Sequence, residues 1–185
     1  MKTGLIASRY AQALYEFASD YKMEDEIYKG MKILEKSFSL NRELNTVLRN
    51  PLLKRELKKQ LIVTAYGGEV DIVFERFIEL ILNNKREAYL QNIVLKYLDV
   101  YYEHKNLCIV KLKIAFPIGQ ESEKKLIDSI KKLVLKDLIV EKEIDPKIIG
   151  GFILEIGDVR WDGSLATQLN KIHKKLMEGT FLNLN

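Results

Sequence analysis

Hydrophobic residues recur at helical spacing through the first hundred residues. One series opens the chain, with apolar side chains three and four residues apart at Leu5, Ile6, Tyr10, Ala13, Leu14 and Phe17. A second series runs through Ile27, Met31, Leu34 and Phe38. This spacing gives each segment one apolar face, which is typical of a helix packed against a core.

Shorter apolar segments follow around 44–48 and 53–65, separated by Asn50-Pro51. Because proline has no N–H to donate, we place Pro51 in the first turn of the second segment. The Gly67-Gly68 pair then breaks the pattern. Two further helical series lie on either side of "NNKRE", the first at Val70, Val73, Phe74, Phe77, Ile78, Ile81 and Leu82, the second at Tyr89, Leu90, Ile93, Val94, Tyr97, Leu98 and Tyr101. Six helices with short connections predict an antiparallel bundle over residues 1–105.

The period changes to two after His104. Apolar residues alternate with Ile109, Lys111 and Lys113, at Cys108, Val110, Leu112, Ile114 and Phe116. This alternation predicts a half-buried strand that ends at Pro117. A helix from about Ser122 and strands at 138–144, 150–156 and 159–162 follow, the last two joined by a tight turn at Gly157-Asp158.

A terminal helix completes this second part, marked by Leu165, Leu169, Ile172 and Leu176. Asp162 or Ser164 is placed to cap its first turn. We expect Leu169 and Leu176 to lie in the core and Lys171, Lys174 and Lys175 to face acidic partner helices. The chain is therefore predicted to be mainly α, with a six-helix bundle over 1–105 and a small α+β domain over 106–185.

Composition excludes several classes of protein. No run approaches the length of about 18 apolar residues that a membrane span needs, and the N-terminus lacks a secretory signal. The single cysteine, Cys108, excludes an internal disulfide. The net charge of +4 is divided evenly, with 17 Lys/Arg against 15 Asp/Glu in 1–105 and 13 against 11 in 106–185. This balance argues against a charge-driven partner such as nucleic acid.

The glycine-rich stretch "IIGGFILEIGDVRWDGSLATQL" (148–169) is the main candidate for chemistry. It lacks the G-x-x-x-x-G-K-[ST] of a phosphate loop and the G-x-G-x-x-G of a dinucleotide site. Asp158 and Asp162 do not have the alternating spacing of a calcium loop. One cysteine and two histidines cannot form a structural zinc site of Cys and His alone. The stretch is predicted to shape turns, and we expect no catalytic, cofactor-binding or metal site.

The same stretch resembles the C-terminal signature of the delta subunit of bacterial F-type ATP synthase, the family of the mitochondrial oligomycin-sensitivity-conferring protein. The residues that match the signature are Gly150, Gly151, Ile156, Gly157, Asp158, Asp162, Gly163, Ser164, Leu165 and Leu169. "IASRYAQALYEFA" is similar to the family's opening helix, without its usual proline before Tyr10. "LILNNKREAYLQ" is similar to its N-x-R junction, with Lys85 in place of the common glycine.

The resemblance implies a non-catalytic stator connector, which joins the catalytic head of the rotary enzyme to its peripheral stalk and resists torque. Residues 1–105 are expected to bind the N-terminal helix of an alpha subunit. Residues 106–185 are expected to hold the stalk's b subunits. The chain would then act at the cytoplasmic face of the bacterial inner membrane, attached only through the complex.

The resemblance also implies which residues touch the alpha subunit, in a groove between the first and fifth helices. They are Tyr10, Ala13, Leu14, Phe17, Arg76, Phe77, Leu80 and Asn84. For Leu14, Phe17 and Phe77 a core position is the favoured interpretation, because apolar stripes usually face inward. Tyr10, Ala13, Arg76 and Leu80 lie nearer the margins of the stripe and are the stronger candidates for contact. The glycines and acids of the C-terminal signature, with Ser164, are expected to be mainly structural.

Two other classes remain open at this point. A helical nucleic-acid-binding module would use the lysine runs at 54–59 and 171–175, and its affinity would fall steeply with salt. A helical adaptor or regulatory domain would need a pocket that sequence alone does not reveal.

Overall fold

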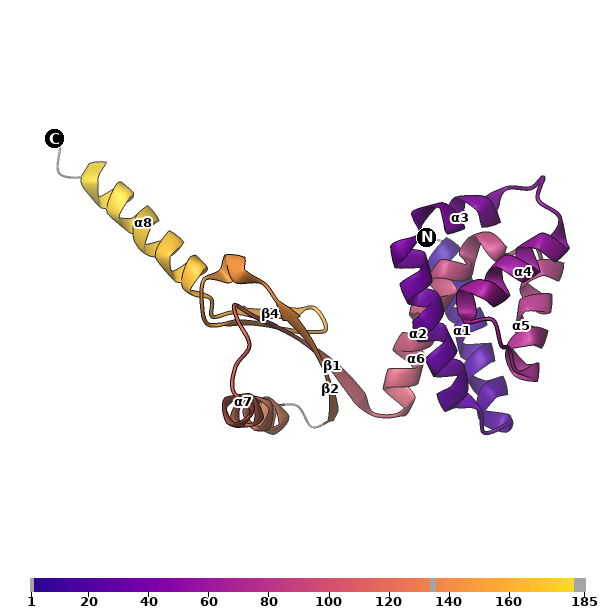
Figure 1. Ribbon diagram of the computed structural model, residues 1–185, viewed down its shortest axis with the longest axis horizontal. Coiled ribbons are helices and arrows are strands. Elements are labelled where there is room, and N and C mark those ends of the chain that lie inside the picture. The colour runs from indigo at the N-terminus through magenta and orange to yellow at the C-terminus, as the bar shows by residue number, and fades with distance from the viewer. Residues whose placement is uncertain (1, 134–135, 182–185) are drawn as a thin grey trace. The chain divides into compact units, whose positions relative to one another are not determined.

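The computed structural model describes residues 2–133 and 136–181. The chain divides into two compact units that meet between Lys105 and Asn106. The regular elements described in the first unit are all helices, whereas the second unit contains a sheet (Figure 1). The prediction of a mainly helical chain with a small C-terminal α+β part is confirmed.

The helices of the first unit follow the predicted apolar series. They are α1 (Lys2–Asp20), α2 (Glu24–Leu40), α3 (Arg42–Arg49), α4 (Arg55–Tyr66), α5 (Ile72–Asn83), the single 3-10 turn η1 (Glu87–Tyr89) and α6 (Leu90–His104). α6 packs against both α1 and α2, and α2 also packs against α4. The series face inward, since the fully buried side chains include Leu14, Ile27, Met31, Leu34, Ile62, Phe74, Ile78, Ile81, Leu90, Ile93 and Tyr97.

Two details of the first unit differ from the sequence prediction. Pro51 does not open a helix, because it lies in a turn and α4 begins only at Arg55. Leu5 belongs to the predicted apolar series but is 59% exposed. Leu5 lies near the start of α1, and the buried part of this helix begins after it, with Ala7 and Ala11.

α1 and α5 end in the same way. In each, two backbone N–H groups return to carbonyls of the last turn: Met23 to Ala18 and Lys22 to Ser19 in α1, and Arg86 to Ile81 and Lys85 to Leu82 in α5. This is the Schellman arrangement, whose left-handed residue is usually glycine. Here that residue is a lysine in both helices, Lys22 with φ 57° and Lys85 with φ 53°. The place where the resemblance expects glycine at Lys85 is therefore a left-handed position.

The second unit is a four-stranded sheet with two helices. Its elements are β1 (Leu107–Ile114), α7 (Gln120–Leu133), β2 (Asp137–Ile144), the 3-10 turn η2 (Pro146–Ile148), β3 (Phe152–Ile156), β4 (Val159–Asp162) and α8 (Leu165–Phe181). The strand order is β2-β1-β3-β4. β1 and β2 are parallel and joined through α7, whereas β3 is antiparallel to both β1 and β4.

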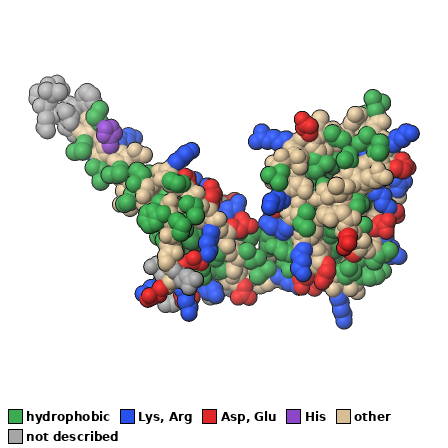
Figure 2. Space-filling view, in the orientation of Figure 1, with side chains coloured by type: hydrophobic (Ala, Val, Ile, Leu, Met, Phe, Trp, Pro, Cys, Tyr) green, Lys and Arg blue, Asp and Glu red, His purple; other side chains and the backbone are tan. Residues whose placement is uncertain are grey.

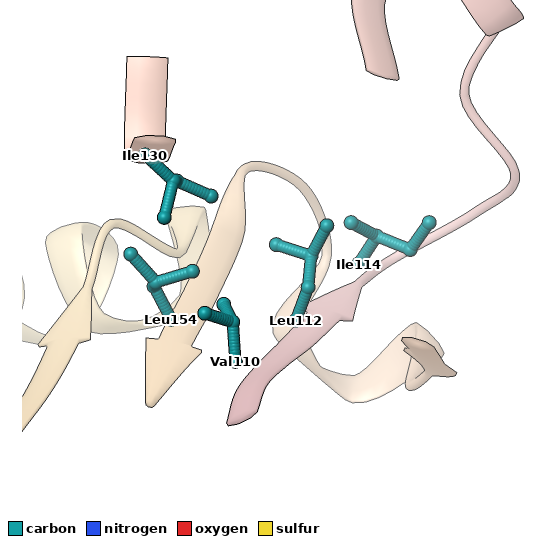
Figure 3. Close-up of a cluster of buried hydrophobic side chains, with 5 residues drawn as sticks. All are labelled: Val110, Leu112, Ile114, Ile130 and Leu154. Atoms are coloured by element: carbon teal, nitrogen blue, oxygen red, sulfur yellow. The ribbon is translucent and has the colours of Figure 1, made fainter. Parts of the chain in front are cut away.

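One face of the sheet carries the core of the second unit. The alternation that predicted β1 turns Val110, Leu112 and Ile114 to this face, where they meet Leu154 of β3 and Ile130 of α7 (Figure 3). The strand ends at Ile114, three residues before the predicted end at Pro117, so Phe116 lies beyond it and is 60% exposed.

Charged side chains alternate across the other face of the sheet. Lys113 pairs with Glu143 of β2 at 3.0 Å, and Arg160 of β4 lies 3.5 Å from Glu155 of β3. Cross-strand pairs of opposite charge suit a solvated face. The unit therefore buries one face of its sheet, whereas the second face carries these charged pairs together with Ile153, which is buried in a small cluster with Ala115 and Ile148.

Candidate partner-binding surfaces

α1 and α5 are linked by two hydrogen bonds between side chains. Asn84 Nδ2 donates to the Tyr10 hydroxyl at 3.1 Å, and Arg76 Nη1 donates to the Tyr21 hydroxyl at 3.3 Å. Tyr10 and Tyr21 are about three helical turns apart in the sequence, so the two bonds mark the ends of a shared surface. We call this surface, formed by Tyr10, Ala13, Phe17, Arg76, Leu80 and Asn84, the α1–α5 face.

The residues expected in the groove differ in how far they are exposed. Leu80 is 47% exposed, Ala13, Arg76 and Asn84 are exposed, and Tyr10 and Phe17 are half-buried. Leu14 and Phe77 are also residues that the resemblance places at this surface, but they are only 1% and 5% exposed, in line with the core position that their apolar spacing favoured. These two side chains belong to the core and support the α1–α5 face from beneath.

Charge is distributed unevenly around α5. Lys59 of α4 binds both Glu75 and Glu79 of α5, at 2.8 and 3.1 Å. These hydrogen bonds raise the pKa of Lys59, with Glu75 the larger cause. Arg76, on the α1 side, has no ion pair among the residues that the structure describes. The α1–α5 face thus combines exposed apolar carbon with one cation.

Tyr21 is the residue beside this face that the sequence prediction missed. Its ring packs edge-on against Phe17, with centroids 5.0 Å apart. The signal was present, because Tyr21 continues the series of Tyr10, Leu14 and Phe17 at a spacing of four. The polar residues Ser19 and Asp20 interrupt that series and hide it.

Two glycines of the C-terminal signature lie where a side chain would clash, and two have left-handed backbone. Gly151 has φ 75°, and a Cβ there would lie 2.3 Å from the backbone oxygen of Gly163. A Cβ on Gly150 would lie 2.7 Å from the Leu165 side chain. Gly157 has φ 55° in the exposed turn between β3 and β4, next to the exposed Asp158. Left-handed backbone and close approach are the conditions that favour glycine.

Asp162 and Ser164 form the start of α8 together. Ser164 Oγ accepts from the Thr167 N–H at 3.2 Å, which makes Ser164 the helix cap. Asp162 Oδ1 accepts from both the Ser164 hydroxyl, at 2.6 Å, and the Ser164 N–H, at 3.0 Å. The hydrogen bond from the Ser164 hydroxyl is the largest cause that lowers the pKa of Asp162, and the bond from the Ser164 N–H is the next. The acid therefore orients the cap rather than binding a ligand.

α8 carries an exposed hydrophobic stripe. The helix packs against η2 at its start, and hydrophobic side chains follow it outward (Figure 2). The prediction that Leu169 and Leu176 lie in the core is wrong, since they are 53% and 66% exposed. The stripe comprises Leu165, Leu169, Ile172, Leu176 and Met177, each at least 45% exposed. Periodicity predicted the apolar side of this helix but not whether the chain itself covers it.

Within 2–133 and 136–181, no three side chains of His, Cys, Asp or Glu converge as metal ligands would. In the same ranges, no helix is both long enough and apolar enough to cross a membrane.

Comparisons with known proteins agree with this arrangement. The family model of the ATP synthase delta (OSCP) subunit matches residues 6–176. ATP synthase subunit delta of Bacteroides thetaiotaomicron is 38% identical over 180 residues, covering 96% of this chain and 97% of its own. The delta subunit of Phocaeicola vulgatus is 37% identical, with 96% of each chain covered.

The fold has a counterpart of known structure. A chain in the cryo-EM structure of the Toxoplasma gondii mitochondrial ATP synthase hexamer matches 92% of this chain and 97% of its own. The TM-score is 0.65 at 16% sequence identity, so this match supports the fold and no statement about function.

The matched family consists of structural, non-catalytic subunits of a larger machine. The chain belongs to the ATP synthase delta (OSCP) subunit family. ATP synthesis and proton transport are therefore activities of the F-type complex, to which this chain contributes no active site of its own.

Proposed function

We propose that the chain is the stator connector of its ATP synthase. In this role residues 1–105 bind the N-terminal helix of an alpha subunit in the catalytic head. Residues 106–185 bind the ends of the b subunits in the peripheral stalk. The connector resists the torque of the rotor and is held at the cytoplasmic face of a bacterial membrane through the complex alone.

The composition of the α1–α5 face is the observation that carries the head contact. Exposed Leu80 and half-buried Phe17 offer apolar anchors, and small Ala13 lets a guest backbone approach. An amphipathic helix binds such a surface through residues at i, i+3, i+4 and i+7. Tyr10 and Asn84 at one end and Arg76 at the other supply polar contacts that fix the position of the guest.

The α8 stripe supports the stalk contact. Leu165, Leu169 and Ile172 recur at spacings of four and three, as on a helix that packs lengthwise against another helix. Lys171 and Lys175 are exposed beside them, where acidic partner helices would complement their charge. The helix would then bury on the stalk the apolar surface that it exposes alone.

Mechanical function requires slow dissociation more than fast binding. A contact of standard size buries about 800 Å² per partner, and affinities of related complexes differ mainly in their off-rates. A chain held at two places also rebinds as an intramolecular event, which raises its effective concentration at each site.

The head contact is tested by titrating the isotope-labelled full chain with a peptide of an alpha subunit's first residues, about 20 long, or some five helical turns. We expect saturable shifts of the Tyr10, Ala13 and Arg76 amides. Ala13→Asp should weaken binding at least about tenfold, or 1.4 kcal/mol, because it introduces a charge at the apolar centre.

Ser8→Asp is the matched control. Ser8 is also exposed on α1 but is rotated by about 200° from Tyr10, so this variant should bind as the parent does. Equal affinities for both variants and the parent would remove the head contact from the α1–α5 face.

A further inference from the structure

The first unit also has a pocket of about 540 Å³, lined by residues outside the α1–α5 face. It lies where the end of α3, the start of α4 and the turn after α5 meet. Leu48 and Leu82 contribute apolar walls, and the turn that contains Pro51 and Leu53 forms another side. Pockets that hold small molecules have volumes of about 300–1,000 Å³, so this one has the size of a ligand site.

The charged lining of this pocket is strongly basic. Arg49, Arg55, Lys58 and Lys85 line it together with a single acid, Glu87. Lys58 and Glu87 neutralise each other through a contact of 2.5 Å, with side chains only 6% and 14% exposed. Arg49, Arg55 and Lys85 have no ion pair among the residues that the structure describes. Three uncompensated cations thus surround one cavity, although the unit as a whole is nearly neutral.

Glu87 adds a hydrogen-bond acceptor to this basic pocket, so a ligand would need a donor group as well as an anion. One of its carboxylate oxygens accepts from Lys58, but the other, Oε2, is buried and has no hydrogen-bond partner in the described structure. An unpaired buried acceptor lowers the stability of the folded state. A ligand that places a hydroxyl or N–H group against this oxygen would recover that stability.

The backbone at Lys85 has the same left-handed conformation as that at Lys22, which does not line the pocket. Lys85 is held at φ 53°, in the left-handed region that is unfavourable for a residue with a Cβ. Glycine would fit this helix end without strain. A lysine in that position adds a cation to the pocket at the expense of local stability.

We propose that this pocket binds the phosphate ester of a small polyhydroxy compound. Arg49, Arg55 and Lys85 hold the phosphate, for which arginine offers paired N–H donors. Glu87 Oε2 accepts from a hydroxyl of the attached compound, and the apolar walls cover its carbon skeleton. This proposal is independent of the stator function, since none of these residues belongs to the α1–α5 face or to α8.

The test uses the isotope-labelled full chain and three probes: ribose 5-phosphate, methyl phosphate and ribose. Ribose 5-phosphate should saturate and shift amides at 48–58 and 82–88. Methyl phosphate has the anion without the hydroxyls and should bind at least about tenfold more weakly, equal to 1.4 kcal/mol. Ribose has the hydroxyls without the anion and should not bind measurably.

Substitutions test whether ribose 5-phosphate binds in this pocket. Arg55→Gln and Lys85→Gly should each weaken ribose 5-phosphate binding several-fold, and Lys85→Gly does so while relieving backbone strain, so a folding defect cannot explain the loss. Lys36→Gln removes an exposed cation of α2 outside the pocket and should change nothing. Equal affinity for ribose 5-phosphate and methyl phosphate, or shifts that ignore the pocket variants, would overturn the proposal.

Discussion

The two units differ in how completely they cover their hydrophobic side chains. In the first unit, helices from distant parts of the sequence bury long runs of apolar residues at 0–1% exposure. In the second, one sheet face and α7 enclose a small core around Leu112 and Leu154, while α8 exposes Leu169 and Ile172 by more than half. The first unit thus covers most of its large apolar side chains itself, whereas the second leaves apolar side chains of α8 exposed.

The two units also differ in their aromatic residues. All nine tyrosines lie before residue 106, whereas the only tryptophan, Trp161, lies in β4. Aromatic rings stack across the first unit, Tyr28 on Tyr101 at 4.1 Å and Tyr66 on Phe74 at 3.6 Å. Tyrosine and tryptophan signals can therefore follow the two units separately in one intact chain.

The largest effect is expected from truncating a large buried side chain in the core of the first unit. Phe74 is fully buried and stacked on Tyr66, so Phe74→Ala should lower the free energy of unfolding of this unit by about 3–5 kcal/mol. Near-ultraviolet dichroism of the tyrosines measures this loss, while Trp161 fluorescence should keep its parental transition. Phe116→Ala, at a side chain 60% exposed, is the control and should have little effect. A common transition for both signals would show that the units do not unfold separately.

Alkaline pH should also distinguish the units. Burial raises the pKa of Tyr101 to about 12, and its hydrogen bond to Asp25 adds to the rise. Burial likewise raises the pKa of Tyr66 and Tyr97 above the ordinary value of about 10. Because the folded state holds these protons more tightly, their stabilisation is complete below about pH 10 and declines as pH rises toward 12.

Denaturant titrations at pH 9 and pH 11 measure this decline. The midpoint of the tyrosine-monitored transition should fall more than that of the tryptophan-monitored one. Tyr101→Phe removes one of the titrating groups and should reduce the difference between the two pH values. Equal shifts of both transitions would contradict the assignment to buried tyrosines.

A smaller loss is expected at the turn before β3. Gly151→Ala combines left-handed strain with a clash against the Gly163 backbone oxygen, so it should destabilise the second unit by about 3 kcal/mol. Gly157→Ala has the same sign of φ but open space around it, and should cost only about 1 kcal/mol. Thermal unfolding followed by Trp161 compares the two. An equal cost would mean that the close approach at Gly151 contributes nothing.

The smallest effect concerns the start of α8. Ser164→Ala removes the cap that binds the Thr167 N–H and should cost about 1 kcal/mol. The expected readout is a loss of helical signal that partner binding restores, because the exposed helix has little packing of its own. Ser129→Ala, at an exposed serine in the middle of α7, should leave the signal unchanged. A full-sized helical signal in Ser164→Ala would show that packing, not the cap, holds this helix.

The sequence predicted well those features that depend on local periodicity. The helices of the first unit, the alternation in β1 and the turn at Gly157 follow from apolar spacing and glycine chemistry. The start of α4 was misplaced, because Pro51 suits both a helix start and a turn. The prediction that Leu169 is buried was also wrong, since periodicity identifies an apolar face without indicating what covers it.

Features that join distant segments were beyond sequence reasoning. The bond between Arg76 and Tyr21 and the unpaired oxygen of Glu87 depend on tertiary contacts over many residues. Within the expected groove, the apolar spacing correctly favoured core positions for Leu14 and Phe77 and a position at the margin of the stripe for Leu80.

The central claim is that the chain holds two partners at once, one on each unit. Sedimentation of the full chain with two fragments tests it directly: a peptide of the alpha N-terminus and a soluble fragment from the carboxyl end of b. The account predicts one complex containing all three, from which Ala13→Asp releases only the peptide and Leu169→Glu only the b fragment. Partners that exclude each other, or an Ala13→Asp chain that loses the b fragment, would contradict it.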